Sequence, residues 1–310
     1  MTKRTRVWLI IAAVLIVTGA ICCGISFYFA QGDFSVFSTE EFQTMDYELK
    51  GDYVALTITT DTADIVFHPS PDGKTRVICR ENVKSPHAVK IEDDFLKISV
   101  QNQRQWHDYI STGDLIEEER IDIYIPRATY NALYIEGATS DVSIPEGFAF
   151  WTADIALSTG DVYFASSTTG DTEISTDTGD ITLENTHSGM VELETSTGLI
   201  SLTDISCHSL KIEGGSGDVS LRNVCTVRSL EPDFIVETDT GDVHLISCDG
   251  DSIEIETSTG DIYGSLKTEK RVFAESDTGD IDIPPLPDEF GIGFCKLETD
   301  TGDICIEIEN

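Results

Sequence analysis

Apolar and polar residues alternate in short runs from Val54 to the end of the chain, and turn residues separate the runs. Alternation with a period of two predicts β-strands that bury one face. One turn recurs between these runs, with the sequence Thr-Gly-Asp or a near variant. Its glycines are Gly160, Gly179, Gly198, Gly217, Gly241, Gly260, Gly279 and Gly302. Most steps are 19 residues long, which indicates a repeat architecture.

Each repeat supplies one apolar run on either side of the turn, as in Val191 and Leu193 before Gly198, and Ile200 and Leu202 after it. A single repeat cannot bury these faces until its neighbours stack on it. The pattern therefore predicts an all-β, single-chain β-solenoid with coils of about 19 residues. We expect successive copies to follow one another in a continuous, right-handed spiral. Eight turns stacked about 4.8 Å apart would give a rod of roughly 35 to 40 Å.

The pattern divides the chain after residue 50 into an irregular part, residues 51–150, and a regular part, residues 151–310. A degenerate turn, Thr60 to Ile65, lies in the irregular part. Residues 101–120 interrupt the alternation and predict a projecting loop that carries Trp106, His107 and Tyr109. These three residues are candidates for partner binding, because loops on rigid scaffolds often carry recognition. Alternatively, the side chain of Trp106 covers the end or side of the solenoid core.

The N-terminus carries an uncharged apolar stretch, residues 7–29, which is long enough to cross a bilayer as a helix. Lys3, Arg4 and Arg6 precede it. The positive-inside rule then places the N-terminus in the cytoplasm and the repeats outside the cell membrane. We expect residues 1–30 to be a cytoplasmic stub and single-pass anchor, and residues 31–50 a tether. A cleaved signal peptide is the alternative.

The chain is strongly acidic, with 56 acidic and 20 basic residues and a net charge of −36. Without the three basic residues of the anchor region, the exported part keeps 17 basic residues and a charge of −39. This charge excludes nucleic acid as a direct partner and favours cations. We expect the partners to be the cytoplasmic membrane, through residues 7–29, and an envelope protein or a glycan.

Six cysteines lie outside the anchor, and their spacing contains no Cys-x-x-Cys metal motif. Cys207 and Cys225 follow their glycines by nine and eight residues, so they could bridge adjacent coils. Buried free thiols are the alternative.

The phrase Ile121-Asp-Ile-Tyr-Ile-Pro126, followed by serial Thr-x-Thr-Gly-Asp-Ile turns, resembles the bacterial "putative adhesin" family of repeat domains of unknown function, which includes LiaG-like envelope proteins. The resemblance covers roughly residues 50 to 310. It implies a β-solenoid outside the cytoplasmic membrane and an association with adhesion or envelope stress. It implies no catalytic residues. Leu199, where the turn lacks its aspartate, departs from the pattern.

Stacked turns would bring aspartates about 5 Å apart, where like charges repel by roughly 1 kcal/mol in water. One explanation is that each aspartate accepts hydrogen bonds from backbone N–H groups of the turn. The other is Ca²⁺ bound between neighbouring carboxylates, which would be the only cofactor. The candidate ligands are Asp177, Asp180, Asp239, Asp242, Asp261, Asp277, Asp280, Asp300 and Asp303.

The sequence contains no nucleophile elbow, P-loop or His-Glu-x-x-His motif. Stacked carboxylates do match the separation in retaining glycosidases, but a position repeated in every coil cannot be catalytic in each. We therefore expect a non-catalytic, membrane-anchored envelope module. The alternatives are a surface adhesin that binds glycans and a β-helix carbohydrate-active enzyme.

Overall fold

The structure is a computed structural model that describes residues 12, 14–21, 24, 41–101, 118–227, 233–287 and 293–309. The chain divides into two compact units. The first contains residues 1–42 and 103–118, and its described residues 12, 14–21 and 24 are helical. Within the described residues, no helix has the length and apolar character needed to cross a membrane. Most of the segment 7–29 lies outside that description.

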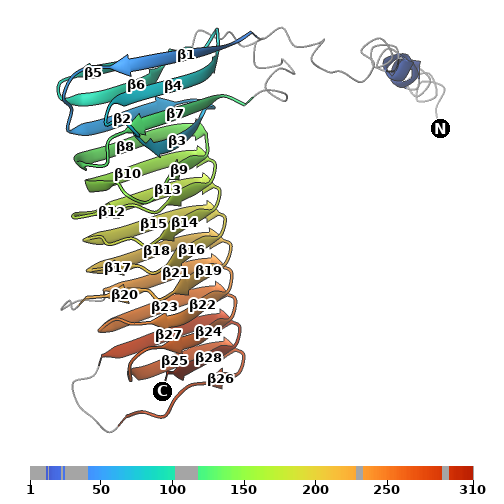
Figure 1. The fold of residues 1–310 in the computed structure, drawn as a ribbon. Coiled ribbons are helices and arrows are strands. Elements are labelled where there is room, and N and C mark those ends of the chain that lie inside the picture. The colour runs from blue at the N-terminus through green and yellow to red at the C-terminus, as the bar shows by residue number, and fades with distance from the viewer. Residues whose placement is uncertain are drawn as a thin grey trace. The chain divides into compact units, whose positions relative to one another are not determined.

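The second unit, residues 43–102 and 119–310, is a β-solenoid built from two long sheets (Figure 1). One 13-stranded sheet, here sheet A, has the order β1(Phe42–Leu49), β4(Thr75–Asn82), β7(Arg120–Ile125), β3(Asp64–Pro69), β9(Val142–Ile144), β11(Val162–Phe164), β14(Ile181–Glu184), β16(Ile200–Thr203), β19(Val219–Arg222), β22(Val243–Cys248), β24(Ile262–Leu266), β28(Ile304–Ile308) and β26(Ile281–Asp282).

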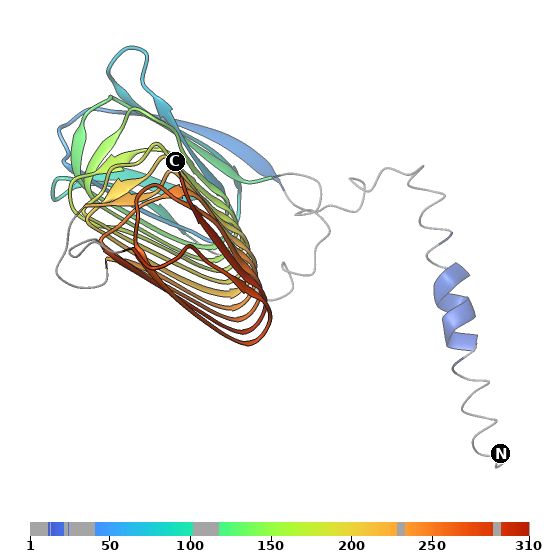
Figure 2. The same cartoon turned by 90° about the horizontal axis from the view of Figure 1, so that it is seen from below.

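The other 13-stranded sheet, sheet B, has the order β25(Arg271–Thr278), β27(Phe294–Thr301), β23(Ser252–Thr259), β21(Phe234–Thr240), β18(Ser209–Ser216), β15(Met190–Thr197), β13(Thr172–Thr178), β10(Ala149–Thr159), β8(Thr129–Thr139), β2(Ala55–Thr60), β6(Phe95–Val100) and β5(His87–Glu92), and β12(Ser167–Thr168) pairs beside β10. Each regular coil runs from sheet B through the Thr-Gly-Asp corner into sheet A. It returns along a short third side, where β17(Ser206–Cys207) pairs with β20(Cys225–Thr226). Figure 2 shows the stacked coils from one end.

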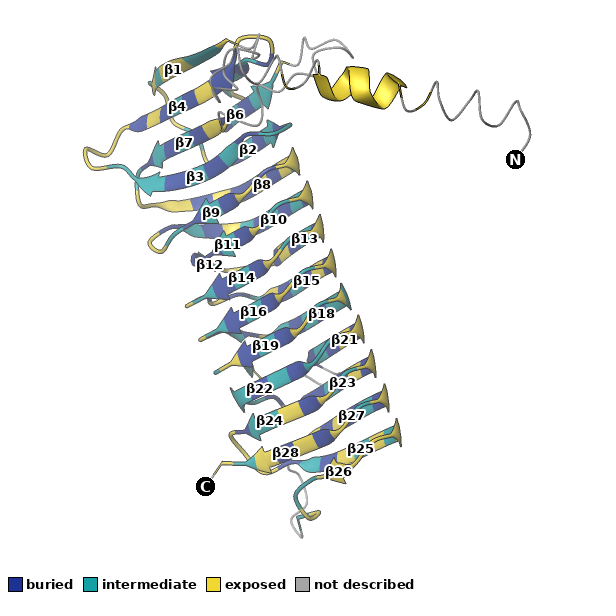
Figure 3. Cartoon of the chain, turned by 90° about the vertical axis from the view of Figure 1, so that its right-hand side faces the viewer, coloured by how far each residue is buried: buried dark blue, intermediate teal, exposed yellow. Residues whose placement is uncertain are grey.

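The core is a column of aliphatic side chains between the two sheets. Ile181 and Leu183 face inward from sheet A, and Val191 and Leu193 from sheet B, all with no exposed surface. Figure 3 shows the buried bands continuing from coil to coil. The predicted all-β solenoid with one turn in each repeat is therefore confirmed. The handedness of the spiral stays a prediction.

The N-terminal end of the solenoid is closed by antiparallel pairs. Sheet A ends with β4 antiparallel to β7, and sheet B ends with β5 antiparallel to β6. Strand β1 adds to β4, although residues 31–50 were expected to be a tether. Its Tyr47 and Leu49 pack against the core, so this segment gains buried area by joining the sheet.

The order of the last two coils differs from the expected continuous spiral. The last coil, β27 and β28, lies between the coil of Gly260 and the coil of Gly279. Strand β28 pairs five residues with β24, whereas β26 has only two residues before Ile283 and Pro284. Because proline cannot donate to a ladder, a strand that runs into Pro284 and Pro285 fits the end of a sheet better than its interior.

Of the two alternatives for Cys207 and Cys225, a bridge between adjacent coils or free thiols, the structure shows the free thiols. Cys207 pairs with Thr226, and Cys225 pairs with Ser206, so the two side chains point to opposite faces. The six cysteines of the described residues are all free thiols. Four are buried, Cys225 is half-buried, and Cys305 is exposed.

Candidate functional site: the aspartate corner and the acidic face

Glycine is required at the Thr-Gly-Asp corner for two reasons. The φ angle of Gly160 is +138° and that of Gly217 is +144°, a region that side chains disfavour. A Cβ atom on Gly217 would also lie 2.0 Å from the carbonyl oxygen of Gly198 in the preceding coil. The corners therefore stack backbone on backbone, which places the following aspartates in register.

These aspartates form a ladder along the corner, which we call the aspartate corner. Each carboxylate before the last, Asp280, accepts a hydrogen bond from the backbone N–H of the equivalent residue in the next coil. For example, Asp242 N–H donates to Oδ1 of Asp218, and Asp261 N–H donates to Oδ1 of Asp242, both at 2.9 Å. The donor–acceptor pairs, at 2.7 to 3.0 Å, are Asp141–Asp64, Asp161–Asp141, Asp180–Asp161, Leu199–Asp180, Asp242–Asp218, Asp261–Asp242, Asp303–Asp261 and Asp280–Asp303.

The ladder confirms that backbone N–H groups satisfy the aspartates, with one difference. The donor lies in the neighbouring coil, so each carboxylate joins two coils. At Leu199 the ladder is interrupted, because leucine offers no acceptor to Asp218 of the next coil. The ladder thus consists of two runs.

Four of the predicted calcium ligands lie three residues before a corner aspartate and are mostly dispersed: Asp177, Asp239, Asp277 and Asp300. Asp177 and Asp239 are separated by the coils of Gly198 and Gly217, which carry Ser196 and Gly215 at this position. Only Asp277 and Asp300 lie on adjacent coils. Calcium binding by the nine predicted aspartates stays a prediction. If it occurs, Asp242, Asp261, Asp303 and Asp280 form the longest unbroken set.

A column of six glutamates, which we call the acidic face, follows the outer surface of sheet B. Strand register places these residues side by side in the order Glu194, Glu213, Glu237, Glu256, Glu298 and Glu275. Lys211 pairs with Glu213 at 2.7 Å, and Lys296 pairs with Glu298 at 2.8 Å. Within the described residues, Glu194, Glu237 and Glu256 have no such cationic partner. Glutamate recurs four positions before the glycine of each of the last six corners, a signal in the sequence that the prediction missed.

A hollow of about 580 Å³ opens on this face. Its lining includes Glu194, Glu213, Glu237 and Glu256 of the acidic face, together with Asp239. Gly214 and Gly215 lie on the middle strand of this hollow. The two neighbouring coils carry threonine beside Gly214, and serine or aspartate beside Gly215. The absence of two side chains there leaves room beside the glutamates.

The protein-family model described as "Toastrack DUF4097" matches residues 53–309. The chain belongs to the toastrack DUF4097 family. The match covers both the irregular and the regular parts of the solenoid, and the comparisons indicate no catalytic family. No curated protein matches the chain.

The solenoid is similar to solved structures with low sequence identity. A "putative adhesin" from Bacteroides fragilis is 16% identical, with a TM-score of 0.46 over 86% of this chain and 97% of that one. A "putative adhesin" from Parabacteroides distasonis is 9% identical, with a TM-score of 0.45 over 86% and 98%. A third, from Parabacteroides merdae, is 8% identical, with a TM-score of 0.46 over 88% and 98%.

The candidate partner-binding residues Trp106, His107 and Tyr109 lie outside the described residues. The projecting loop at residues 101–120 is described only at its ends. Their role stays a prediction.

Leu199→Asn is expected to stabilise this toastrack solenoid by about 1 kcal/mol, because it supplies the missing acceptor for the N–H of Asp218 without adding a charge. Leu199 is 39% exposed, so little buried surface is lost. Urea unfolding measures the change. Leu199→Ala, which has no acceptor, serves as the control and should not stabilise. Equal effects of the two variants would contradict the ladder.

Stability is expected to depend on pH through Asp154 and Glu173, which are neighbours on sheet B. Burial, followed by the charge of Glu136, raises the pKa of Asp154. Burial and then Asp154 raise the pKa of Glu173. Because these folded-state pKa values are raised, the stability they contribute is complete below their unfolded pKa values and is lost as the pH rises through the folded ones.

Asp154→Asn/Glu173→Gln should therefore raise the melting temperature at pH 7. Its advantage over the unsubstituted chain should shrink as the pH falls towards about 4, where carboxyl groups become protonated. Melting curves at several pH values test this, and an advantage independent of pH would contradict it.

Proposed function

We propose that this protein is a non-catalytic, membrane-anchored module outside the cytoplasmic membrane, and that its acidic face binds a basic surface of another envelope protein. The proposal is carried by one observation, the six glutamates held in register along sheet B. The apolar segment 7–29 and the preceding Lys3, Arg4 and Arg6 support the anchor.

The repeated geometry favours binding over catalysis. General acid–base chemistry needs a pair of groups whose environments move their pKa values apart. The ladder carboxylates before Asp280 instead each accept a backbone hydrogen bond of nearly the same length from the next coil. A regular line of equal charges suits an extended partner, because each added contact repeats the one before it.

The charge of the column favours a partner rich in lysine and arginine. Stacked strands hold neighbouring glutamates about 4.8 Å apart at their backbones, so their fields add along the face. Complementary charge mainly increases the association rate and is screened by salt. Binding should therefore weaken steeply as ionic strength rises.

The test uses the full chain in detergent and a fluorescent poly-lysine peptide as the probe. Glu213→Gln/Glu237→Gln/Glu256→Gln should weaken binding at least tenfold. The matched control, Glu48→Gln/Asp93→Asn/Asp94→Asn, changes the net charge equally on exposed residues of the N-terminal end. It should change binding less than twofold. Equal losses would show that net charge alone attracts the probe and would overturn the proposed site.

Anchoring is tested separately by alkaline extraction of cell membranes. The full chain should stay in the membrane fraction, and deletion of residues 7–29 should release it. Release of the full chain would contradict the anchor without affecting the acidic face.

Glycan adhesion is a second candidate, favoured by Trp151, whose exposed fraction of 60% is large for an apolar side chain on strand β10. Trp151→Ala should then abolish binding to cell-wall glycan fragments, whereas Phe273→Ala, at another exposed aromatic residue, should not. Unchanged binding by the Trp151 variant would exclude this residue.

A further inference from the structure

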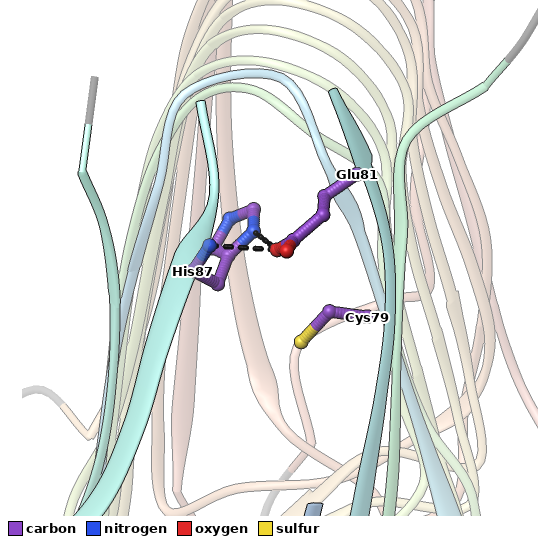
Figure 4. A group of neighbouring side chains, drawn as sticks. All are labelled: Cys79, Glu81 and His87. Atoms are coloured by element: carbon purple, nitrogen blue, oxygen red, sulfur yellow. Dashed lines mark hydrogen bonds and ion pairs between the residues drawn. The ribbon is translucent and has the colours of Figure 1, made fainter. Parts of the chain in front are cut away.

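Three side chains with metal-ligating atoms meet inside the N-terminal end of the solenoid. Cys79 and Glu81 lie two residues apart on β4 and therefore face the same side of sheet A. His87 begins β5 of sheet B. Figure 4 shows the three side chains pointing toward one another in the space between these strands. Their candidate ligand atoms all lie within 4.8 Å of one another.

This cluster is fully enclosed. The side chains of Glu81 and His87 have no exposed surface, and Cys79 is also completely buried. Placing a carboxylate and an imidazole in a core costs free energy unless they are paired. His87 supplies the pairing through its backbone N–H, 2.6 Å from Glu81 Oε2, and through Nδ1, 3.0 Å from the same oxygen. Aliphatic side chains fill the equivalent space elsewhere in the solenoid, so a polar cluster here needs a reason.

The surrounding hydrogen bonds hold these side chains in place. Gln43 Nε2 donates to Glu81 Oε1 at 3.1 Å, and the Thr60 hydroxyl lies 3.3 Å from His87 Nε2. In the pairing with Glu81, Nδ1–H is the donor; moving the proton to Nε2, which then donates to Thr60, would free the lone pair of Nδ1 for an ion. Metal-binding histidines and carboxylates are usually oriented by such outer partners.

The thiol is held in its protonated form when no cation is present. Burial, followed by the nearby charges of Glu81 and Asp122, raises the pKa of Cys79 to about 12. A bound divalent cation would reverse this preference, because a coordinated thiol loses its proton.

We propose that Cys79, Glu81 and His87 bind one Zn²⁺ ion, which joins the two sheets at the N-terminal end of the solenoid. Thiolate, imidazole and carboxylate together are typical zinc ligands, whereas Ca²⁺ and Mg²⁺ take oxygen ligands only. Zinc bond lengths of about 2.0 to 2.3 Å place tetrahedral ligands about 3.5 Å apart, so small side-chain rotations close the set around one ion.

Charge balance supports a divalent ion. One Zn²⁺ with one thiolate, one carboxylate and a neutral imidazole has no net charge, which suits a buried position. Binding displaces the proton of the Cys79 thiol to solvent, and a water molecule completes the tetrahedron. Since the strands enclose the site, the ion would enter as this end of the solenoid folds.

The test measures metal in the full chain, purified in detergent after refolding with Zn²⁺ and removal of loosely bound ions. One zinc per chain is expected by mass spectrometry. Cys79→Ser should lose it, whereas Cys295→Ser, which removes an equally buried thiol from β27, should retain it. Equal zinc in the Cys79 and Cys295 variants, or none in the unsubstituted chain, would overturn the proposal.

A second measurement does not depend on the folding of a variant. Refolding the unsubstituted chain with Co²⁺ in place of Zn²⁺ should give the absorption band of a cobalt–thiolate bond. Surface carboxylates cannot produce this band, so it separates the buried site from ions on the acidic face. A cobalt-loaded chain without the band would also overturn the proposal.

Discussion

Gly217→Ala is expected to lower the free energy of unfolding by about 4 kcal/mol, a large effect for a single added methyl group. Gly217 has a φ angle of +144°, and the new Cβ would lie 2.0 Å from the carbonyl oxygen of Gly198. That oxygen belongs to the backbone of a coil paired on both sides, so it cannot move without disturbing both sheets. Urea unfolding followed by circular dichroism measures the loss.

Gly214→Ala is the matched control in the same coil. Gly214 has no positive φ angle of this kind, and its added Cβ would lie 3.2 Å from the Thr238 hydroxyl, which can rotate. The control should change stability by less than about 0.5 kcal/mol. A similar loss in both variants would show that any side chain in this coil is harmful, and that the corner has no special requirement.

Two engineered cysteine pairs are expected to distinguish the observed order of the last two coils from a continuous spiral. One pair should cross-link almost completely, and the other should not. Glu254 on β23 lies beside Lys296 on β27, and Phe273 on β25 lies beyond Lys296. Glu254→Cys/Lys296→Cys should therefore form a disulfide, because neighbouring strands are about 4.8 Å apart. Mass spectrometry of the oxidised chain measures the bridge.

Glu254→Cys/Phe273→Cys is the complementary pair. These positions are two strands apart, roughly 9.6 Å, which exceeds the reach of a disulfide. It should remain reduced under the same conditions. A continuous spiral would give the opposite results for the two pairs, so the experiment decides between the two coil orders.

Local pattern was sufficient to predict the corner and the core. Alternating residues such as Ile200 and Leu202 can be buried in only one register of the strand. A shift by one residue would expose every apolar side chain. The recurrence of Gly160 and Gly179 likewise predicted a stacked corner, since only glycine tolerates that close approach. The sequence-based predictions failed where the outcome depended on the pairing between coils.

A second corner shows a signal that was overlooked. Asn185, Asp204 and Asn223 recur every 19 residues and have positive φ angles of 52° to 58°. Asparagine and aspartate adopt this conformation more readily than other residues with side chains. Their spacing could have predicted the turns that follow β14, β16 and β19 of sheet A, because it matches the spacing of the glycines.

The spacing of residues from the corner could not predict on which face of a strand a single side chain lies. Cys207 and Cys225 differ by one residue in their distance from the corner, which is enough to turn their side chains to opposite faces. The cluster of Cys79, Glu81 and His87 was also missed, because it forms across two sheets in the least regular part of the chain.

The sequence by itself determined the repeating coil, its inward aliphatic residues and its glycine corner, because each depends on contacts between equivalent positions of near-identical repeats. Tertiary structure alone decided which coil is last, which backbone group satisfies each aspartate and which side chains meet at the N-terminal end. The physical reason is that the repeats are almost interchangeable. Their order is therefore set by small differences, such as Pro284 and the length of β28, whose effect appears only when the coils pack together.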